Sequence, residues 1–261
     1  MSYTETHAAR LKDIKRLLSN VKEKAVIVDN AGAHNAHYRG KNLGNTFTAA
    51  QSAAIRAGTF EDLFPGDYWQ MTKSVSWVDN DGNTQTQTVN VTWLVGGCNY
   101  YKGQYLTTNH IVVVPSSTLG DLPMNSTNTT QGGYMNSQMR LTGLNKAKAL
   151  YKASFGEEHI LEHNEILCNA VTNGVASGYA FEKCTVELMS EEMVYGCQFF
   201  ATEKKTNQKG QLPIFRHQRY GDTWTWLRNV ANASSFCNVA REVSTYEATI
   251  STMVCPYALI Y

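Results

Sequence analysis

The sequence predicts an α+β protein in which a helical N-terminal segment precedes a larger, β-rich domain. Near the N-terminus, apolar residues recur at alternating spacings of three and four, which is the period of a coiled coil. From Val89 to Val95, every second residue is apolar, as in a half-buried strand. Charged residues make up 17% of the chain and aromatic residues 11%, which favours a folded protein over a disordered one.

The N-terminal apolar residues, which we call the seam, occupy the a and d positions of a short heptad pattern. They are Leu11, Ile14, Leu18, Val21 and Ala25. A helix of only about two heptads is too short to be stable alone in water. Two alternatives stay open at this point. The segment forms a dimeric or trimeric coiled coil, which we favour, or it packs on its own domain as an amphipathic helix.

A polar arm and a second helix follow the seam. From Asp29 to Asn45, asparagine, glycine and histidine replace the periodic apolar residues, as expected of an extended arm. Thr48 is a suitable N-cap for a short alanine-rich helix, and Gly58 lies just past its end. We therefore predict that residues 1–46 anchor or oligomerise the chain and that residues 47–261 form the globular domain.

Strands and helices alternate along the rest of the domain. Period-two alternation predicts the strands, while capping residues and glycines place the helix ends. The expected order is β structure over 60–95 with a turn at 80–83, a buried strand over 111–114, and a helix over 134–155, with a break at Gly143 as an alternative. After it come a shorter helix over 164–171 closed by Gly174, a helical turn capped by Ser190, and closing strands over 224–230, 236–239 and 254–261.

Charge and cysteine content narrow the function classes. The formal net charge is +1, so the chain lacks the basic excess expected of a protein that binds nucleic acid. Neither a signal-peptide core nor an uninterrupted run of about 18 apolar residues is present, which argues against membrane insertion. No two of the six cysteines have metal-binding spacing. Because the chain shows no export signal, reduced thiols in a cytosol are expected. The cysteines are Cys98, Cys168, Cys184, Cys197, Cys237 and Cys255.

One histidine pair resembles a catalytic motif. His159 and His163 flank a glutamate in the H-x-x-E-H pattern of inverted zinc peptidases, which needs both imidazoles on one helix face. Gly156 ends the preceding helix, so the pair is expected to enter a strand or turn instead. His34 and His37 lie in the arm without an acidic or thiol neighbour. We therefore expect no metal, no cofactor and no catalytic residue, with ordinary loop histidines as the simpler reading.

Two aromatic segments have the composition of recognition loops. Tyrosine offers rigid, amphipathic contact area, and the neighbouring asparagine and glycine offer adaptable hydrogen bonds. The alternative is that these rings cover hydrophobic layers beneath long loops. The candidate ligand-binding residues are Tyr100, Tyr101, Tyr105, Tyr220 and Trp224.

A set of segments in order along the chain resembles uncharacterised structural proteins encoded by phages and prophages of Gram-positive gut bacteria. The matching segments are 38–43, 58–63, 66–69, 110–115, 124–130, 132–134, 159–161, 186–189, 193–196 and 224–228. Each segment alone is short, and the ordered set carries the resemblance. It implies a component of a virion that is assembled in the bacterial cytoplasm, with other virion proteins as partners.

The C-terminal part is similar to the C-type-lectin-like fold of phage tropism proteins. In that fold a Trp-x-Trp-Leu-Arg strand precedes a Phe-x-x-Val strand and a closing Gly-x-Arg-Pro-Ala-like strand. This chain has the first two at Trp224 to Arg228 and Phe236 to Val239. Its closing segment, 253–258, lacks the glycine and the arginine, which puts a ligand role built on that arginine in doubt. The resemblance implies a surface-recognition scaffold without catalytic residues.

We expect a non-enzymatic structural protein of a tailed bacteriophage, placed in a surface-exposed fibre or tail and recognising a host-surface glycan or protein. One alternative is a capsid or neck decoration protein (a head fibre) whose arm, residues 34–45, inserts into a neighbouring subunit. A remote alternative is a zinc peptidase at His159 and His163.

Overall fold

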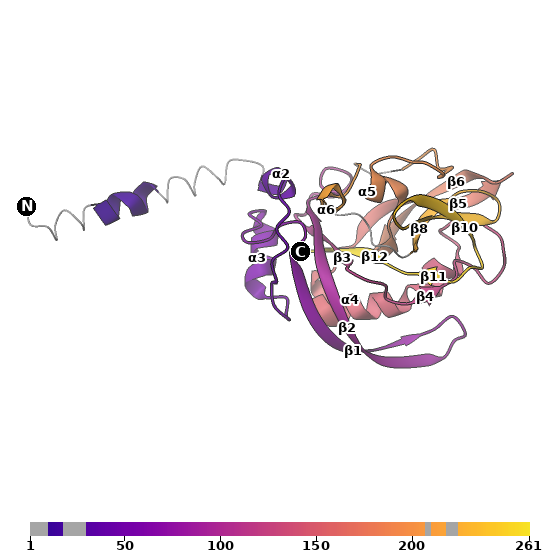
Figure 1. The fold of residues 1–261 in the computed structure, drawn as a ribbon, viewed down its shortest axis with the longest axis horizontal. Helices are drawn as coiled ribbons and strands as arrows, with labels where there is room; N and C mark the ends of the chain where they lie inside the picture. The colour runs from indigo at the N-terminus through magenta and orange to yellow at the C-terminus, as the bar shows by residue number, and fades with distance from the viewer. Residues whose placement is uncertain (1–9, 18–29, 207–209, 218–223) are drawn as a thin grey trace, which may run out of the picture.

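The computed structural model describes residues 10–17, 30–206, 210–217 and 224–261. Strands and helices are mixed along these residues, which confirms the predicted α+β class. The C-terminus lies beside α3 (Ala49–Ala57), where the Ser52 hydroxyl donates to the carbonyl oxygen of Tyr261 at 3.4 Å (Figure 1). No helix among the described residues is both long and apolar enough to cross a bilayer.

The first sheet has the strand order β1–β2–β3–β12–β7, and all neighbouring strands are antiparallel. The C-terminal strand is hydrogen-bonded on both of its edges, which explains the wholly apolar composition of the last residues. The strands are β1 (Tyr68–Val78), β2 (Thr84–Cys98), β3 (Ile111–Pro115), β7 (Val186–Leu188) and β12 (Pro256–Ile260).

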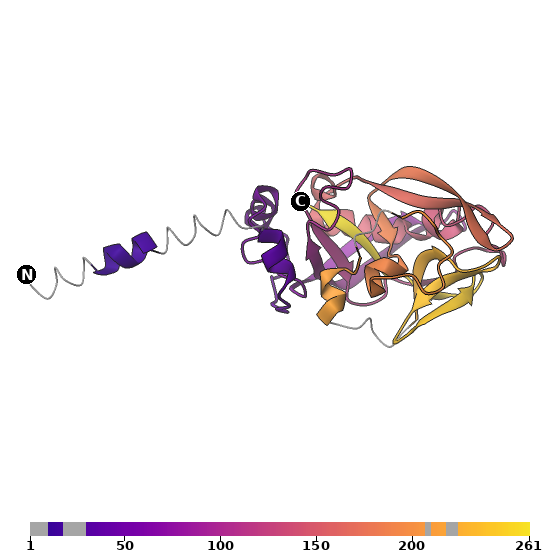
Figure 2. The ribbon, with the colours of Figure 1, turned by 90° about the horizontal axis from the view of Figure 1, so that it is seen from above.

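The second sheet has the order β10–β9–β8–β11–β4, and a separate hairpin pairs β5 with β6. In Figure 2 the hairpin (salmon) and the sheet (gold) lie on opposite sides of the domain, at the end away from the N-terminus. The strands are β4 (Asp121–Leu122), β5 (His163–Thr172), β6 (Val175–Cys184), β8 (Thr225–Val230), β9 (Ser235–Val239), β10 (Val243–Glu247) and β11 (Thr252–Met253).

The predicted helix caps are confirmed. The Thr48 hydroxyl accepts from the backbone N–H of Gln51, whose side chain accepts from the N–H of Thr48, and Gly58 ends α3 at a φ of 71°. The Ser190 hydroxyl caps α5 by accepting from the backbone N–H of Met193. The remaining helices are α2 (Asn30–Asn35), a π-helical turn (Met139–Gly143), α4 (Asn145–Phe155), a 3-10 turn (Glu157–His159), α5 (Glu191–Tyr195) and α6 (Pro213–His217).

Aromatic side chains join α4 to the inner face of the first sheet. The Trp93 ring lies 4.2 Å from the Tyr151 ring, and its indole N–H donates to Ser154 Oγ at 2.9 Å. Phe155 packs edge-on against Trp69 at 5.7 Å. Large fully buried rings with satisfied polar atoms make this one of the main hydrophobic cores of the domain.

The helix predicted over residues 164–171 is wrong, because this segment is strand β5. Gly174 was expected to end a helix, but it forms a two-residue hairpin turn with Asn173. Both turn residues have positive φ, 51° for Asn173 and 76° for Gly174. Asn-Gly is the preferred sequence for a type I′ turn, whose twist matches the flanking strands, so the dipeptide favours a hairpin over a helix end.

The helix predicted over residues 134–155 is confirmed only in its second half. Its N-terminal part forms turns and the π-helical segment, and regular α-helix begins at Asn145. The predicted end at Phe155, followed by Gly156, is correct. Asn125 lies at the start of this helical segment, where its side chain accepts from the backbone N–H of Gln138 at 2.9 Å.

The arm is attached to its own domain. It begins with the unpredicted helix α2 and then runs beside β1, where the N–H of Leu43 donates to the Tyr68 carbonyl at 2.7 Å. Arg39 binds the buried carboxylate of Asp67 and also Asp62. In this conformation the arm is therefore not extended toward a neighbouring subunit. The predicted boundary between residues 46 and 47 stays a prediction.

The described part of the seam is exposed. Residues 10–17 are helical, as predicted, and Leu11 and Ile14 keep 60% and 52% of their surface. The other three seam residues, Leu18, Val21 and Ala25, lie outside the described residues. Leu11 and Ile14 therefore do not pack against the chain's own domain in this structure, contrary to the second alternative.

Candidate functional site

Two of the five candidate ligand-binding residues, Tyr100 and Tyr101, are buried in this structure, and their role in ligand binding stays a prediction that this conformation does not favour. The Asn99 N–H donates to the His110 carbonyl at 2.8 Å, which closes the loop and turns both rings inward. Tyr100 is 7% exposed and donates its hydroxyl to the carbonyl of Gly210, while Tyr101 is 1% exposed. Both rings belong to a hydrophobic core, and only Tyr100 also lines the edge of a surface cavity among the described residues.

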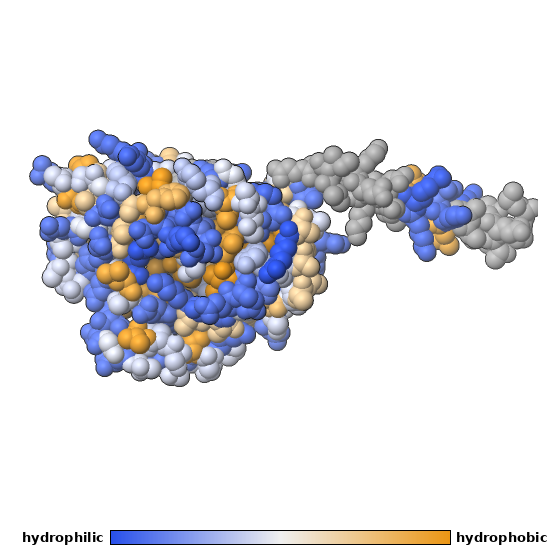
Figure 3. Space-filling model, turned by 180° about the vertical axis from the view of Figure 1, so that it is seen from behind, coloured by the Kyte–Doolittle hydropathy of each residue, from blue (hydrophilic) through white to orange (hydrophobic). Residues whose placement is uncertain are grey.

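The exposed candidate is Tyr105, which keeps 72% of its surface. Its ring meets the exposed ring of Phe181 from β6 edge-on, with centroids 4.8 Å apart. Trp224 is half-buried against Tyr246, and Tyr220 lies outside the described residues. On the face drawn in Figure 3, hydrophobic residues form several separate groups among hydrophilic ones. Because both rings are exposed and in contact, Tyr105 and Phe181 together form a small aromatic surface.

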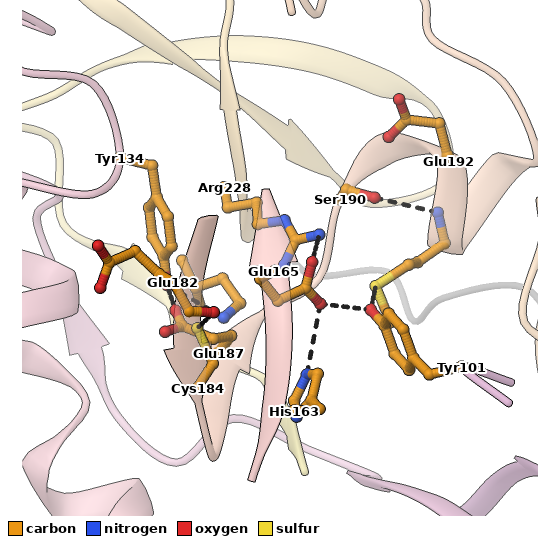
Figure 4. A network of polar contacts seen from close by, with 12 residues as sticks. Tyr101, Tyr134, His163, Glu165, Glu182, Cys184, Glu187, Ser190, Glu192 and Arg228 are labelled. Carbon is orange, nitrogen blue, oxygen red and sulfur yellow. Dashed lines mark hydrogen bonds and ion pairs between the residues drawn. The ribbon is translucent and has the colours of Figure 1, made fainter. Parts of the chain in front are cut away.

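A buried polar network surrounds Glu165 of β5 (Figure 4). Arg228 of β8 donates to Glu165 Oε2 at 2.9 Å. Glu165 Oε1 accepts from the Tyr101 hydroxyl at 2.5 Å and from the Tyr257 hydroxyl. His163, on the same face of β5, lies 3.4 Å from that oxygen. One carboxylate therefore joins β5, β8, β12 and the loop after β2.

Charge pairing keeps this network ionised. Burial alone would raise the pKa of Glu165, but the charge of Arg228 and the contact with His163 outweigh it and hold the pKa well below its usual range. Glu165 is fully buried and Arg228 is nearly so. Four strands and loops meet at these buried charges, so the network organises the core.

A second buried charge lies next to the first. Glu187 of β7 accepts from the Tyr134 hydroxyl at 2.7 Å and from Arg140 Nε at 3.0 Å. The Tyr134 hydroxyl in turn accepts from the N–H of Leu188 at 3.1 Å. These bonds fasten the π-helical turn to the first sheet, so this segment departs from the α-helix while its polar groups stay satisfied.

A third buried carboxyl behaves differently from the first two. Burial raises the pKa of Glu203 to about 7, and bonds from the Val230 N–H at 2.7 Å and the Asn229 amide offset only part of that effect. Neither of these two contacts is made by a cation. At neutral pH the folded protein therefore holds a carboxyl group that is partly protonated.

Glu203→Gln is expected to stabilise the protein more at pH 8 than at pH 5. A carboxyl whose folded pKa is raised favours folding below the unfolded pKa, 4.5, and this contribution is lost as pH rises through about 7. The pKa difference between the unfolded and folded states corresponds to a loss of about 3 kcal/mol in the free energy of unfolding. Glutamine does not ionise, so the variant does not lose this stability as pH rises. Urea unfolding of both proteins at the two pH values measures the difference. The exposed Glu242→Gln is the matched control, and an equal Glu203→Gln effect at both pH values would contradict the assignment.

The histidine motif is not assembled into a metal site. His159 lies in the 3-10 turn with Nδ1 2.9 Å from the Tyr261 carbonyl, whereas His163 begins β5 and faces the Glu165 network. The two imidazoles therefore do not share a helix face, in agreement with the helix end predicted at Gly156. His34 contacts the Leu63 carbonyl at 2.6 Å. Among the described residues, no group of three metal-ligating side chains is present.

A cavity of about 220 Å³ opens where the β1–β2 hairpin, β4 and the start of α4 meet. It combines one aromatic ring, apolar side chains and both signs of charge, which is the mixture typical of small-ligand sites. None of its residues was among the predicted binding residues. The lining residues used below are Trp77, Asp79, Asn80, Asp121, Thr142 and Lys146.

Comparison of the chain with protein-family models, curated proteins and solved structures gives no match. The phage resemblance and the C-type-lectin-like assignment therefore rest on the sequence segments alone.

Proposed function

We propose that this chain is a non-enzymatic structural protein of a tailed bacteriophage virion, in a surface-exposed fibre or tail position, where it recognises a host-surface glycan or protein. The observation that carries the proposal is the exposed seam. Leu11 and Ile14 present apolar surface on a short helix next to a folded domain with its own cores. Apolar a and d positions are buried when helices associate, and fibres and tips are symmetric assemblies of this kind.

The C-type-lectin-like assignment is part of this proposal. The two segments that carry the resemblance form β8 and β9, which pair antiparallel within the second sheet, and the closing segment leads into β12. The adjacent placement of β8 and β9 supports the assignment, while β12 belongs to the first sheet. The missing arginine of the closing motif means that a ligand site, if shared with that fold, must use other side chains.

Exposed aromatic surface supports the recognition role. Tyr105 adopts a left-handed backbone conformation, with a φ of 59°, which is unusual for an aromatic residue and holds its ring outward against Phe181. Conformations of this kind persist where the surrounding loop enforces them, and they gather at binding sites. The same loop places Tyr100 and Tyr101 in the core, so it is anchored at one end and exposed at the other.

Localisation on particles tests the proposal. Antibody against residues 47–261 is expected to label purified virions at the tail tip or fibres, and the purified full-length chain is expected to adhere to host cells. Absence of the chain from purified particles would overturn the proposal.

A further inference from the structure

One wall of the cavity at the end of the β1–β2 hairpin is aromatic. Trp77 lies on the same face of β1 as the buried Val75, but the hydrophobic layer ends here and leaves the indole half-buried. Below it, apolar side chains from three other segments form the floor. They are Leu119, Leu122, Ala147 and Val254. The cavity thus offers a flat apolar surface of the size of one small ring.

Three charged side chains line this cavity, Asp79, Asp121 and Lys146, and the last two do not neutralise one another. The Lys146 ammonium, at the start of α4, lies 5.3 Å from the centroid of the Trp77 ring. Asp121 is exposed on β4. Within the described ranges, neither group forms an ion pair with the other or with a third group. The Lys146 ammonium, with three N–H donors, and the Asp121 carboxylate, with two acceptor oxygens, are therefore both available to a ligand in the cavity.

The polar rim is already held in place. The Thr142 hydroxyl donates to Asn80 Oδ1 at 2.6 Å, and Asp79 accepts from the backbone of the hairpin turn and from the Gln85 amide. These bonds orient the Asn80 amide and the hairpin end before any ligand arrives. A rim fixed in advance reduces the entropy lost on binding.

We propose that this cavity binds a single pyranose ring, an assignment that rests on the proposed function for the source of the sugar, a host-surface glycan. A pyranose has one face of C–H groups that suits the Trp77 indole and apolar floor. Its equatorial hydroxyls both donate and accept, so neighbouring hydroxyls can donate to Asp121 and accept from Lys146. The volume of about 220 Å³ lies below the roughly 300–1,000 Å³ of sites for drug-sized ligands, which fits one ring and not an oligosaccharide.

The test is a titration of the full-length protein with the methyl glycosides of glucose, galactose and N-acetylglucosamine, followed by proton–nitrogen correlation spectra. The indole N–H signal of Trp77 is assigned by its loss in Trp77→Phe. At least one sugar is expected to move this signal in a saturable manner. Asp121→Asn, an exposed change that leaves the core intact, is expected to weaken the affinity by about tenfold or more, because a charge-assisted hydrogen bond is lost. Val78→Ala, on the opposite face of β1, is the matched control and keeps the affinity unchanged.

Two results would overturn the assignment: no sugar moves the Trp77 signal, or the affinity is the same in Asp121→Asn. If no sugar reaches Trp77 while the chain still labels virions and adheres to host cells, the cavity assignment fails and the proposed function stands. A sugar that binds at Trp77 with the expected Asp121 dependence supports the assignment even if the chain is absent from particles, in which case only the proposed function fails.

Discussion

Replacing Arg228 with methionine is expected to lower the free energy of unfolding by roughly 3–5 kcal/mol at pH 7, because it leaves the fully buried Glu165 carboxylate without its cation. The hydroxyl groups of Tyr101 and Tyr257 still donate to that carboxylate, but they carry no charge. Urea unfolding followed by circular dichroism measures the loss. It should shrink at pH 4, since an unpaired buried carboxyl has a raised pKa and protonates in the folded state.

A double variant and a surface variant test the cause of this loss. Glu165→Gln combined with Arg228→Met removes both charges and is expected to recover part of the stability. Lys183→Met breaks an exposed ion pair with Glu162 and should change stability by about 1 kcal/mol or less. If Arg228→Met is as mild as Lys183→Met, or the double variant is no more stable than the single one, the network does not hold the core as described.

Substitutions in the seam are expected to change the oligomeric state of the chain. The full chain is expected to be a dimer or trimer, and the variant Leu11→Asn with Ile14→Asn is expected to be a monomer, because polar a and d side chains remove the apolar contacts between helices. Light scattering coupled to size-exclusion chromatography measures the mass directly. The short seam makes the assembly sensitive to even two substitutions.

The matched control uses the outer face of the same helix. Lys12→Asn with Arg16→Asn changes two exposed residues at positions that face away from the seam, and it should leave the oligomer intact. A wild-type chain that is monomeric over the whole concentration range, or a seam variant that keeps the wild-type mass, would contradict an oligomerising role.

Elements defined by neighbouring residues could be predicted from the sequence. Thr48 and Gly58 placed α3, Ser190 placed the start of α5, and alternation placed the β1–β2 hairpin, because caps, turns and half-buried strands depend on residues a few positions apart. The prediction for the segment around Asn173 is wrong because Gly174, considered alone, indicates a helix end. The dipeptide Asn-Gly, with β-forming residues on both sides, was the available signal.

Sites that depend on distant residues could not be predicted in the same way. Tyr101 was interpreted as a recognition residue from its local composition, but its burial is decided by Glu165 and Tyr257, which lie far away in the sequence. Similarly, Trp77 and Lys146 come from separate elements and meet only in the folded chain. No local pattern marks either arrangement, because each is created by packing between elements.

Immunogold electron microscopy of purified particles tests the central claim most directly. Antibody raised against residues 47–261 is applied to intact virions, and antibody against an unrelated cytoplasmic protein of the same host is the control. We predict discrete label at the tail tip or fibres. Label over the capsid or neck would instead indicate a decoration protein, and particles without label would contradict the proposal that this chain is a virion component.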